Sequence, residues 1–313
     1  MIDITLQNFE AELINASMQT PVLLDIWAPW CGPCKSLGPV LEKLEADYAG
    51  RFTLAKLDSD DQPDIAGQLS QAFGVRSIPF CVMFVGGQPI DGFVGALPES
   101  QIRSFLDKHV PSADALAAVE EAQEAELLAA EGDSDAALAK LSEALAIAPG
   151  DDAIRADYVK RLLEAGRTAD ARRVYEPLGP KAIVDARASA LALWLEACEV
   201  AAKARAPEAL AAAIGADKRD FAARFELAQT HMAAQRHTEA MDELLEILMR
   251  DKAWSDERAR KLYVAILELL SKPQPKAAPT EAKGTLEIAG KAAAVASDPV
   301  VDGYRRKLSM VLF

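Results

Sequence analysis

The sequence predicts an α/β domain with a mixed central sheet flanked by helices, followed by an all-α array of helical repeats. Before Pro111, short apolar runs with β-branched and aromatic residues, typical of buried strands, alternate with helical segments. After Pro111 the chain is rich in Ala, Leu and Glu with helical periodicity. A spacing of 34 residues between two turn glycines indicates internal repeats. The 313 residues suffice for about two domains of ordinary size.

The α/β part is assigned to residues 1–110. Residues 22–27 and 81–85 are apolar, too short for helices and bounded by Pro or Gly, so each is predicted to be a buried strand. The alternation predicts the order β-α-β-α-β, then a hairpin across a Gly-Gly pair, then a helix near residues 98–109. Parallel strands joined by helices and ending in a hairpin make a mixed sheet.

The helical part is assigned to residues 114–270 because of its repeats. A turn glycine, two small contact positions and a terminating proline, spaced as in the tetratricopeptide repeat, occur at Gly132, Ala137, Ala144 and Pro149. Further copies occur at Gly166, Ala171 and Tyr175, and at Ala228, Gln235, Ala240 and Ile247, where Gln235 stands at the turn. Residues 186–220 match the pattern poorly, and residues 256–270 predict a capping helix. A generic alanine-rich bundle is the alternative to such a stack of helix pairs.

Composition and charge exclude several classes of function. The net charge of −14 disfavours nucleic acid as a partner. Without an apolar run of about eighteen residues, no transmembrane helix is expected. The first residues lack the basic region and apolar run of a signal peptide, which favours the cytoplasm. The net charge is −7 over residues 1–110, −10 over 111–270 and +3 over 271–313, so a basic tail follows an acidic body.

The tail divides into a linker and a helix. Residues 271–297, rich in Pro, Ala, Gly and Lys, predict a flexible linker. Asp298 and Pro299 suit the N-cap and the first position of a helix over residues 298–313. Its apolar stripe, at helical spacing, consists of Val301, Tyr304, Leu308 and Val311. Three roles stay open: docking on the repeats, insertion into a partner's groove, and attachment to a membrane surface, for which three basic residues are a weak signal.

The strongest motif is the Cys-x-x-Cys of Cys31 and Cys34, directly after the first apolar strand. A helix N-terminus has unpaired N–H groups and a partial positive charge, which favour the thiolate of Cys31, the position expected to be more exposed. Cys34, one turn on, can attack a mixed disulfide and release a reduced product. Half of a zinc site is the alternative, but such a site needs four ligands. The only other cysteines are Cys81 and Cys198, both expected in the core, and the three histidines lie far along the chain with no ligand spacing. Neither metal nor cofactor is therefore predicted.

The α/β part resembles thioredoxin through the motif Trp27-Ala28-Pro29-Trp30-Cys31-Gly32-Pro33-Cys34-Lys35. The resemblance implies that Trp30 belongs to the active site and that Asp25 is a buried proton acceptor for the second cysteine. It also implies that Lys56 is paired with Asp25, and that Pro79 is the cis-proline of a loop facing the active site. Phe80 departs from the family, where a small polar residue often follows this proline, and is expected to make the rim more apolar.

The order of thioredoxin domain, repeats and C-terminal amphipathic helix resembles the chaperedoxin family, also called YbbN or CnoX. Segments 87–93 and 304–308 carry this resemblance most clearly. It implies a co-chaperone that holds unfolding or oxidised clients, protects or reduces their cysteines, and passes them to the chaperonin GroEL, with DnaK as a further recipient. The tail residues implied to contact the chaperonin are Tyr304, Arg305, Arg306, Leu308, Val311, Leu312 and Phe313.

The sequence thus predicts a protein-disulfide reductase in which Cys31 is the nucleophile and Cys34 resolves the mixed disulfide. Thioredoxin reductase or another thiol donor would supply the electrons. Two other functions stay open. The chain could be a non-catalytic holdase or adaptor with an incidental redox centre, or a dedicated reductase for one folded partner.

Overall fold

The computed structural model describes residues 2–271 and 298–312. Contacts within the chain divide it into two units, which separate between Leu116 and Ala117, within the first turn of α4 (Ala113–Ala130). Residues 272–297, nearly all of the predicted linker, lie outside the described residues.

The first unit is built on a mixed sheet. Within the described residues its strands are β1 (Ile2–Asp3), β2 (Val22–Trp27), β3 (Thr53–Asp58), β4 (Phe80–Val85) and β5 (Gln88–Val94). They lie in the order β1-β3-β2-β4-β5, with β1, β3 and β2 parallel and with β4 antiparallel to both β2 and β5. The predicted strands at 22–27 and 81–85 are confirmed as β2 and β4, and the Gly-Gly pair joins β4 to β5. The predicted α/β class is therefore confirmed.

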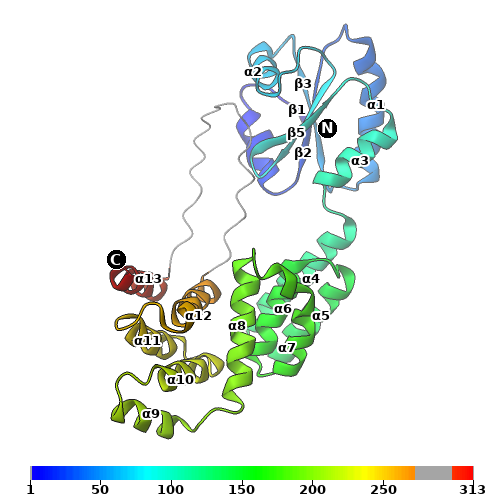
Figure 1. Cartoon of the computed structure of the whole chain (residues 1–313). Coiled ribbons are helices and arrows are strands. Elements are labelled where there is room, and N and C mark those ends of the chain that lie inside the picture. The colour runs from blue at the N-terminus through cyan, green and yellow to red at the C-terminus, as the bar shows by residue number, and fades with distance from the viewer. Residues whose placement is uncertain (1, 272–297, 313) are drawn as a thin grey trace. The chain divides into compact units, whose positions relative to one another are not determined.

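Helices cover both faces of this sheet: η1 (Phe9–Asn15), η2 (Ala16–Met18), α1 (Gly32–Asp47), α2 (Pro63–Phe73) and α3 (Glu99–His109). Helices α1 and α3 lie on one face and α2 on the other (Figure 1). Because side chains alternate along a strand, Leu23 and Cys81 pack towards α1 and α3, whereas Leu24 and Val82 pack towards α2 and η1. The same alternation puts Asp25 on the α1 side, next to the redox motif.

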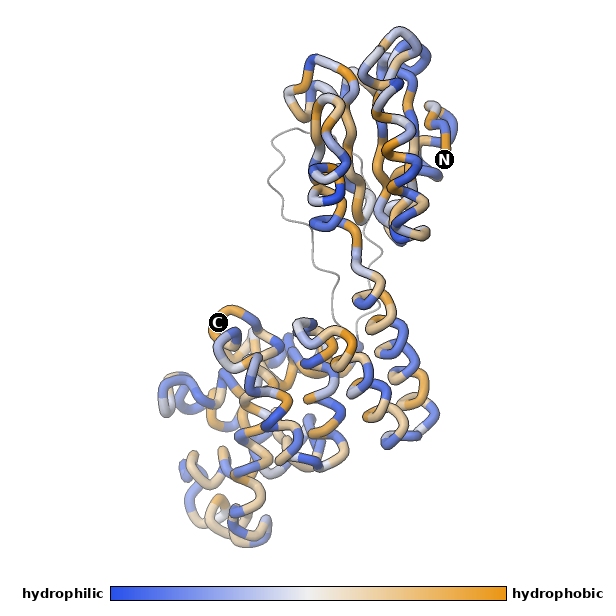
Figure 2. Tube along the Cα trace, turned by 90° about the vertical axis from the view of Figure 1, so that its right-hand side faces the viewer, coloured by the Kyte–Doolittle hydropathy of each residue, from blue (hydrophilic) through white to orange (hydrophobic). Residues whose placement is uncertain are grey.

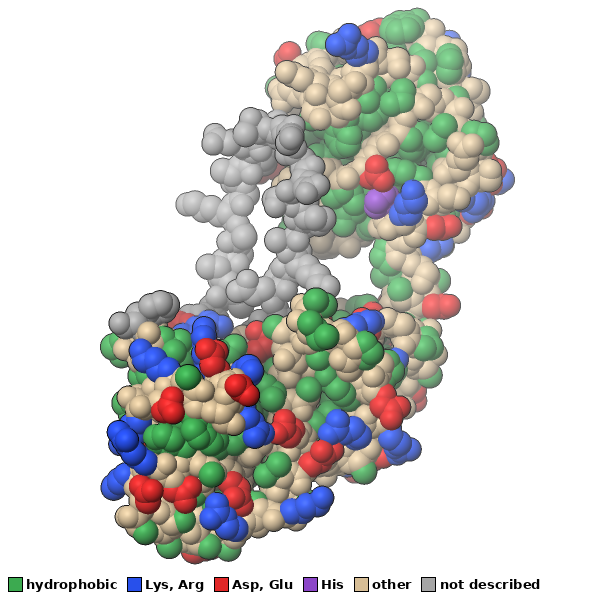
Figure 3. Space-filling view, in the orientation of Figure 1, with side chains coloured by type: hydrophobic (Ala, Val, Ile, Leu, Met, Phe, Trp, Pro, Cys, Tyr) green, Lys and Arg blue, Asp and Glu red, His purple; other side chains and the backbone are tan. Residues whose placement is uncertain are grey.

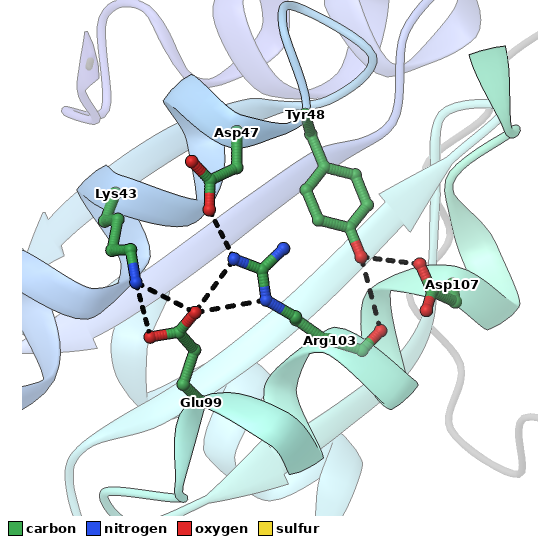
Figure 4. A network of polar contacts seen from close by, with 6 residues as sticks. All are labelled: Lys43, Asp47, Tyr48, Glu99, Arg103 and Asp107. Carbon is green, nitrogen blue, oxygen red and sulfur yellow. Dashed lines mark hydrogen bonds and ion pairs between the residues drawn. The ribbon is translucent and has the colours of Figure 1, made fainter.

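A polar network fastens α3 to the last turns of α1 (Figure 4). Arg103 on α3 donates to Asp47 on α1 and, at 2.8 Å, to Glu99. Lys43 donates to the same Glu99 carboxylate at 2.9 Å. These side chains are 34–59% exposed, so solvent screens each ion pair and its contribution to stability is small. The network orients α3, while the buried apolar residues between α3 and the sheet hold it.

The second unit is all-α within its described residues. Its helices are α4 (Ala113–Ala130), α5 (Ser134–Ile147), α6 (Asp152–Glu164), α7 (Thr168–Tyr175), η3 (Glu176–Lys181), α8 (Ala186–Ala201), α9 (Pro207–Ala216), α10 (Phe221–Ala233), α11 (His237–Leu248), α12 (Trp254–Leu270) and α13 (Pro299–Leu312). Hydrophilic and hydrophobic residues alternate along these helices (Figure 2), as expected where each helix buries one face. The predicted capping helix at 256–270 corresponds to α12.

The predicted contact positions of the repeats are buried between paired helices. Ala144 on α5, Ala171 on α7, and Ala228 and Ala240 on α10 and α11 each have no exposed surface. A small side chain there lets the backbones of two helices approach closely. The prediction of tetratricopeptide-type helix pairs is therefore confirmed, and the alternative of a generic alanine-rich bundle is wrong.

The turns between the paired helices require left-handed backbone. Gly132 and Gly166 adopt φ values of +90° and +72°, which glycine takes without steric cost. Gln235, which replaces the glycine in the third copy, adopts φ of +59° in the same place. The repeat geometry therefore imposes a left-handed backbone at this turn, which the Cβ of a residue other than glycine disfavours.

The poorly matching segment at 186–220 departs from the helix-pair pattern. It forms α8 and α9, but α8 packs against α10 and α12, whereas α9 packs against α10. Trp194 on α8 is 1% exposed and lies in the main core of the unit. A long apolar helix central to that core replaces the missing repeat.

Candidate active site

The two motif cysteines form a disulfide at the N-terminus of α1. The Sγ atoms of Cys31 and Cys34 are 2.02 Å apart. Cys31 is the N-cap of α1, and its Sγ accepts a hydrogen bond from the backbone N–H of Cys34 at 3.2 Å. Pro33 lies in the first turn, where a missing N–H has no cost. The chain thus holds its redox pair at the positive end of a helix dipole.

The disulfide is almost covered. Cys31 and Cys34 are each 3% exposed, so the expectation that Cys31 is the more exposed of the two does not hold for the oxidised protein. Ala28 and the partly buried Trp27 and Ile78 pack against the pair and cover most of its surface. A substrate that reacts with Cys31 must therefore contact the residues that flank the disulfide, and these residues define the site.

Trp30 and the cis-proline loop flank the disulfide. Trp30 is 70% exposed, and its indole N–H donates to Asp60 at 2.9 Å, which fixes a large apolar surface beside Cys31. The Ile78–Pro79 peptide bond is cis, as the resemblance implies. The carbonyl of Pro79 accepts a hydrogen bond from Gly95 N–H at 2.8 Å. Because this bond ties the loop to the end of β5, the cis-proline has a fixed position.

Phe80 does not belong to the rim. It is 1% exposed and packs edge-to-face against Phe73 of α2, with ring centroids 5.5 Å apart. The expectation that it makes the substrate-facing surface more apolar is wrong. As the first residue of β4, Phe80 points to the α2 face of the sheet, away from α1.

Asp25 lies in the middle of β2 with 2% of its surface exposed. Burial raises its pKa from 3.8 to about 6, although the positive charge of Lys56 and a hydrogen bond from Cys81 act in the opposite direction. A carboxyl group with such a pKa exchanges protons near neutral pH, which suits a proton acceptor.

Lys56 forms its ion pair with a different residue from the one implied by the resemblance. It lies beside Asp25 in the parallel register of β2 and β3, but its Nζ contacts Glu42 Oε1 on α1 at 2.8 Å. Its charge still favours the ionised form of Asp25 through space. The direct ion pair of Lys56 in the structure is thus with Glu42, and its interaction with Asp25 acts through space.

Cys81 is fully buried, in agreement with its predicted place in the core. It also has a polar role, because its Sγ lies 3.7 Å from Asp25 Oδ1. Glu42 and Cys81 are the residues of this site that sequence reasoning missed. For Cys81, the available signal was the alternation of side chains along a strand. It places Cys81 on the same face as Asp25 only if β4 lies beside β2 in this register.

The tail residues lie on α13, which packs on α11 and α12 of the same unit. Tyr304 is 8% exposed and donates to Asp242 at 3.0 Å, while Tyr263 donates to the carbonyl of Tyr304 at 2.8 Å. Leu308 and Val311 pack against the same core. The structure thus shows the docked state, one of the three roles left open.

Of the remaining tail residues, some contact other parts of the helical unit and others are exposed to solvent. Lys252 donates to the carbonyl of Leu312 at 3.0 Å, and Arg305 donates to Ser271 at 2.7 Å. Arg305 and Arg306 are exposed. Phe313 lies outside the described residues.

A disulfide at a helix N-terminus, a buried carboxyl group behind it and a cis-proline loop in front of it define a thioredoxin-type dithiol–disulfide site. Comparison with protein families agrees. The thioredoxin profile matches residues 1–108, and tetratricopeptide-repeat profiles match residues 128–195 and 200–283.

Curated relatives cover the first unit. "Thioredoxin 2" of Chlorobaculum tepidum is 47% identical over 104 residues, which are 33% of this chain and 90% of that protein. "Thioredoxin" of Chlorobaculum thiosulfatiphilum is 45% identical over 104 residues, 33% of this chain and 91% of that protein. "Thioredoxin" of Haemophilus influenzae is 42% identical over 103 residues, again 33% and 91%. The chain belongs to the thioredoxin family and carries tetratricopeptide repeats after its thioredoxin domain.

These findings support thioredoxin-type disulfide oxidoreductase activity. Over the described residues, no helix has both the length and the hydropathy needed to cross a membrane. The same part of the chain contains no cluster of three potential metal-ligating side chains.

Proposed function

We propose that this protein is a protein-disulfide reductase that works on unfolding or oxidised client proteins in the cytoplasm. The observation that carries the proposal is the Cys31–Cys34 disulfide at the N-terminus of α1, with Asp25 buried nearby. A thiol donor such as thioredoxin reductase first converts the pair to the dithiol. The helix N-terminus then stabilises the thiolate of Cys31.

The reaction on a client proceeds in two exchanges. The Cys31 thiolate attacks one sulfur of the client disulfide, forms a mixed disulfide and releases the other client sulfur as a thiolate. Cys34 gives its proton to the Asp25 carboxylate and attacks Cys31 Sγ. The client leaves fully reduced, and the Cys31–Cys34 disulfide of the structure re-forms.

Insulin reduction tests this activity. With dithiothreitol as the donor, the wild type should precipitate the insulin B chain, and Cys31→Ser should abolish the reaction. Cys198→Ser, which changes a thiol of the other unit, is the matched control and should keep full activity. An inactive wild type, or an active Cys31→Ser variant, would contradict the proposal.

The repeats add a non-covalent holdase function. Charged side chains of both signs, with hydrophobic ones between them, cover the helical unit on the face seen in Figure 3. Ile183 and Val184, adjacent on the loop before α8, are 92% and 89% exposed, and Leu127 on α4 is 67% exposed. Such side chains can bind apolar segments of unfolded clients. Binding there raises the effective concentration of client cysteines near Cys31.

Aggregation assays separate the holdase from the reductase. Suppression of the aggregation of a cysteine-free client should persist in the Cys31→Ser/Cys34→Ser variant and weaken in Ile183→Asp/Val184→Asp. Failure of the wild type to protect any unrelated client would favour a dedicated reductase with one folded partner.

The resemblance to chaperedoxins adds a handover of clients to the chaperonin GroEL, or to DnaK, with α13 as the GroEL-binding segment. Since Tyr304 is buried in the docked state, the side chains available to a partner are exposed ones such as Arg305, Arg306 and Met310. Arg306→Glu changes this surface and leaves both the apolar stripe and the contact of Arg305 with Ser271 intact. It should reduce co-purification of GroEL as deletion of residues 298–313 does, and unchanged recovery in both would count against the handover.

A further inference from the structure

Cys81 and Asp25 form a buried polar pair behind the redox disulfide. They lie directly opposite each other in the antiparallel register of β4 and β2. Cys81 is 0% exposed and Asp25 is 2% exposed, and Cys81 Sγ lies 3.7 Å from Asp25 Oδ1. A buried carboxyl group depends on its few polar neighbours because little of its surface meets bulk solvent.

The direction of this hydrogen bond follows from the chemistry of the two groups. Burial and the neighbouring Asp25 raise the pKa of the Cys81 thiol well above its usual value, so the sulfur keeps its proton. An ionised carboxylate can only accept. Therefore Cys81 donates to Asp25 when Asp25 is charged, and a bond of this kind favours the charged form.

The other groups around Asp25 do not supply this contact. From β3, Lys56 contributes its charge, but its ammonium group is bonded to Glu42 of α1. From α1, Cys34 lies at the start of the helix, and in the disulfide it has no proton to give. Among the described residues, the side chain that hydrogen-bonds Asp25 is Cys81.

We propose that Cys81 is a positioning residue of the redox reaction: its thiol orients the Asp25 carboxylate and favours its ionised form, ready to accept the proton of Cys34. The inference rests on the proposed function, in which Asp25 accepts this proton before Cys34 attacks the mixed disulfide. The proton moves from Cys34 Sγ to Asp25 and on to solvent. Cys81 neither gains nor loses a covalent bond.

The direct test is the titration of Asp25 in the full-length disulfide form, followed by NMR of ¹³C-labelled aspartate carboxyl groups and assigned with Asp25→Asn. Neither Cys31 nor Cys34 binds protons in this form, so Asp25 titrates without them. In Cys81→Ala and Cys81→Val, which are smaller and larger side chains without a donor, the pKa of Asp25 should rise by about half a unit, a roughly threefold gain in proton affinity. Cys81→Ser keeps a donor and should leave the pKa at or below the wild-type value.

A change in packing alone does not produce this pattern, because Ala and Val alter volume in opposite directions. Cys198→Ala removes a thiol from the other unit and should leave the Asp25 titration unchanged. An Asp25 pKa in both Cys81→Ala and Cys81→Val that equals or falls below the wild-type value would overturn the proposal. So would a rise in Cys81→Ser equal to that in Cys81→Ala.

A second readout separates this inference from the proposed function. The pH at which insulin reduction reaches half its maximum should move upward with the Asp25 pKa in Cys81→Ala and Cys81→Val, and not in Cys81→Ser. If the wild type reduces no insulin at any pH, the proposed reductase activity fails. The carboxyl titration still decides whether Cys81 sets the charge of Asp25.

Discussion

Removing the buried carboxyl group of Asp25 should stabilise the oxidised thioredoxin domain, and the gain should depend on pH. Burial raises the pKa of Asp25 from 3.8 in an unfolded chain to about 6 in the folded one. Between these values the folded protein binds more protons than the unfolded one, so stability falls as the pH rises. At about 1.4 kcal/mol per pKa unit, the loss is about 3 kcal/mol and is complete above pH 6 to 7.

Asp25→Ala removes this penalty but also leaves a small cavity, whose cost does not depend on pH. The informative quantity is therefore the stability of Asp25→Ala minus that of the wild type at two pH values. It should be about 3 kcal/mol larger at pH 7.5 than at pH 3.5. The cost of the cavity cancels in this difference, and the contact with Cys81 is already part of the pKa of Asp25.

Hydrogen–deuterium exchange is the suitable assay because the two units need not unfold together. Protection of the buried amides of β2 and β4 reports the free energy of opening of the first unit alone. Asp61→Ala, which removes an exposed carboxyl group of the same unit, is the matched control for the loss of one acidic side chain. A difference between Asp25→Ala and wild type that is equal at both pH values would refute the reasoning.

Three further predictions concern stability. Gln235→Gly should stabilise the helical unit by about 0.5–1 kcal/mol in urea denaturation, because it relieves the left-handed φ of +59°; a loss would mean that the side chain outweighs the strain. Gly92→Ala should destabilise the first unit by about 1–3 kcal/mol in thermal melts, since its Cβ would lie 2.7 Å from the Cys81 carbonyl oxygen; an unchanged melting temperature would contradict this close approach. Tyr304→Ala should cost about 3 kcal/mol and release α13, seen as faster proteolysis there than in Arg306→Ala; equal cleavage rates would show that α13 is held by other contacts.

Much of the architecture followed from local pattern. Residues 22–27 have the length and composition of a buried strand, and the tertiary structure agrees with this local preference. The repeat alanines were identifiable because the same offset recurs along the chain. The segment at 186–220 was not, since its helices pack on α10 and α12 and carry no periodic signature.

In the active site, local sequence patterns predict some residues and not others. Cys31, Cys34 and the cis state of Pro79 were available from the motif and the resemblance. The partner of Lys56 was not, because Glu42 approaches from a helix whose rotation over the sheet depends on the whole core.

The sequence by itself determined the class of each part of this chain and the redox motif, because periodicity, turn residues and the Cys-x-x-Cys are written within short segments. Only the tertiary structure decided which side chains meet. Neighbouring positions of β4 point to opposite faces, so Phe80 enters the α2 core while Cys81 reaches Asp25. Strand order and register set that contact, and the docking of α13 on α11 and α12 is likewise a property of two surfaces far apart in the chain.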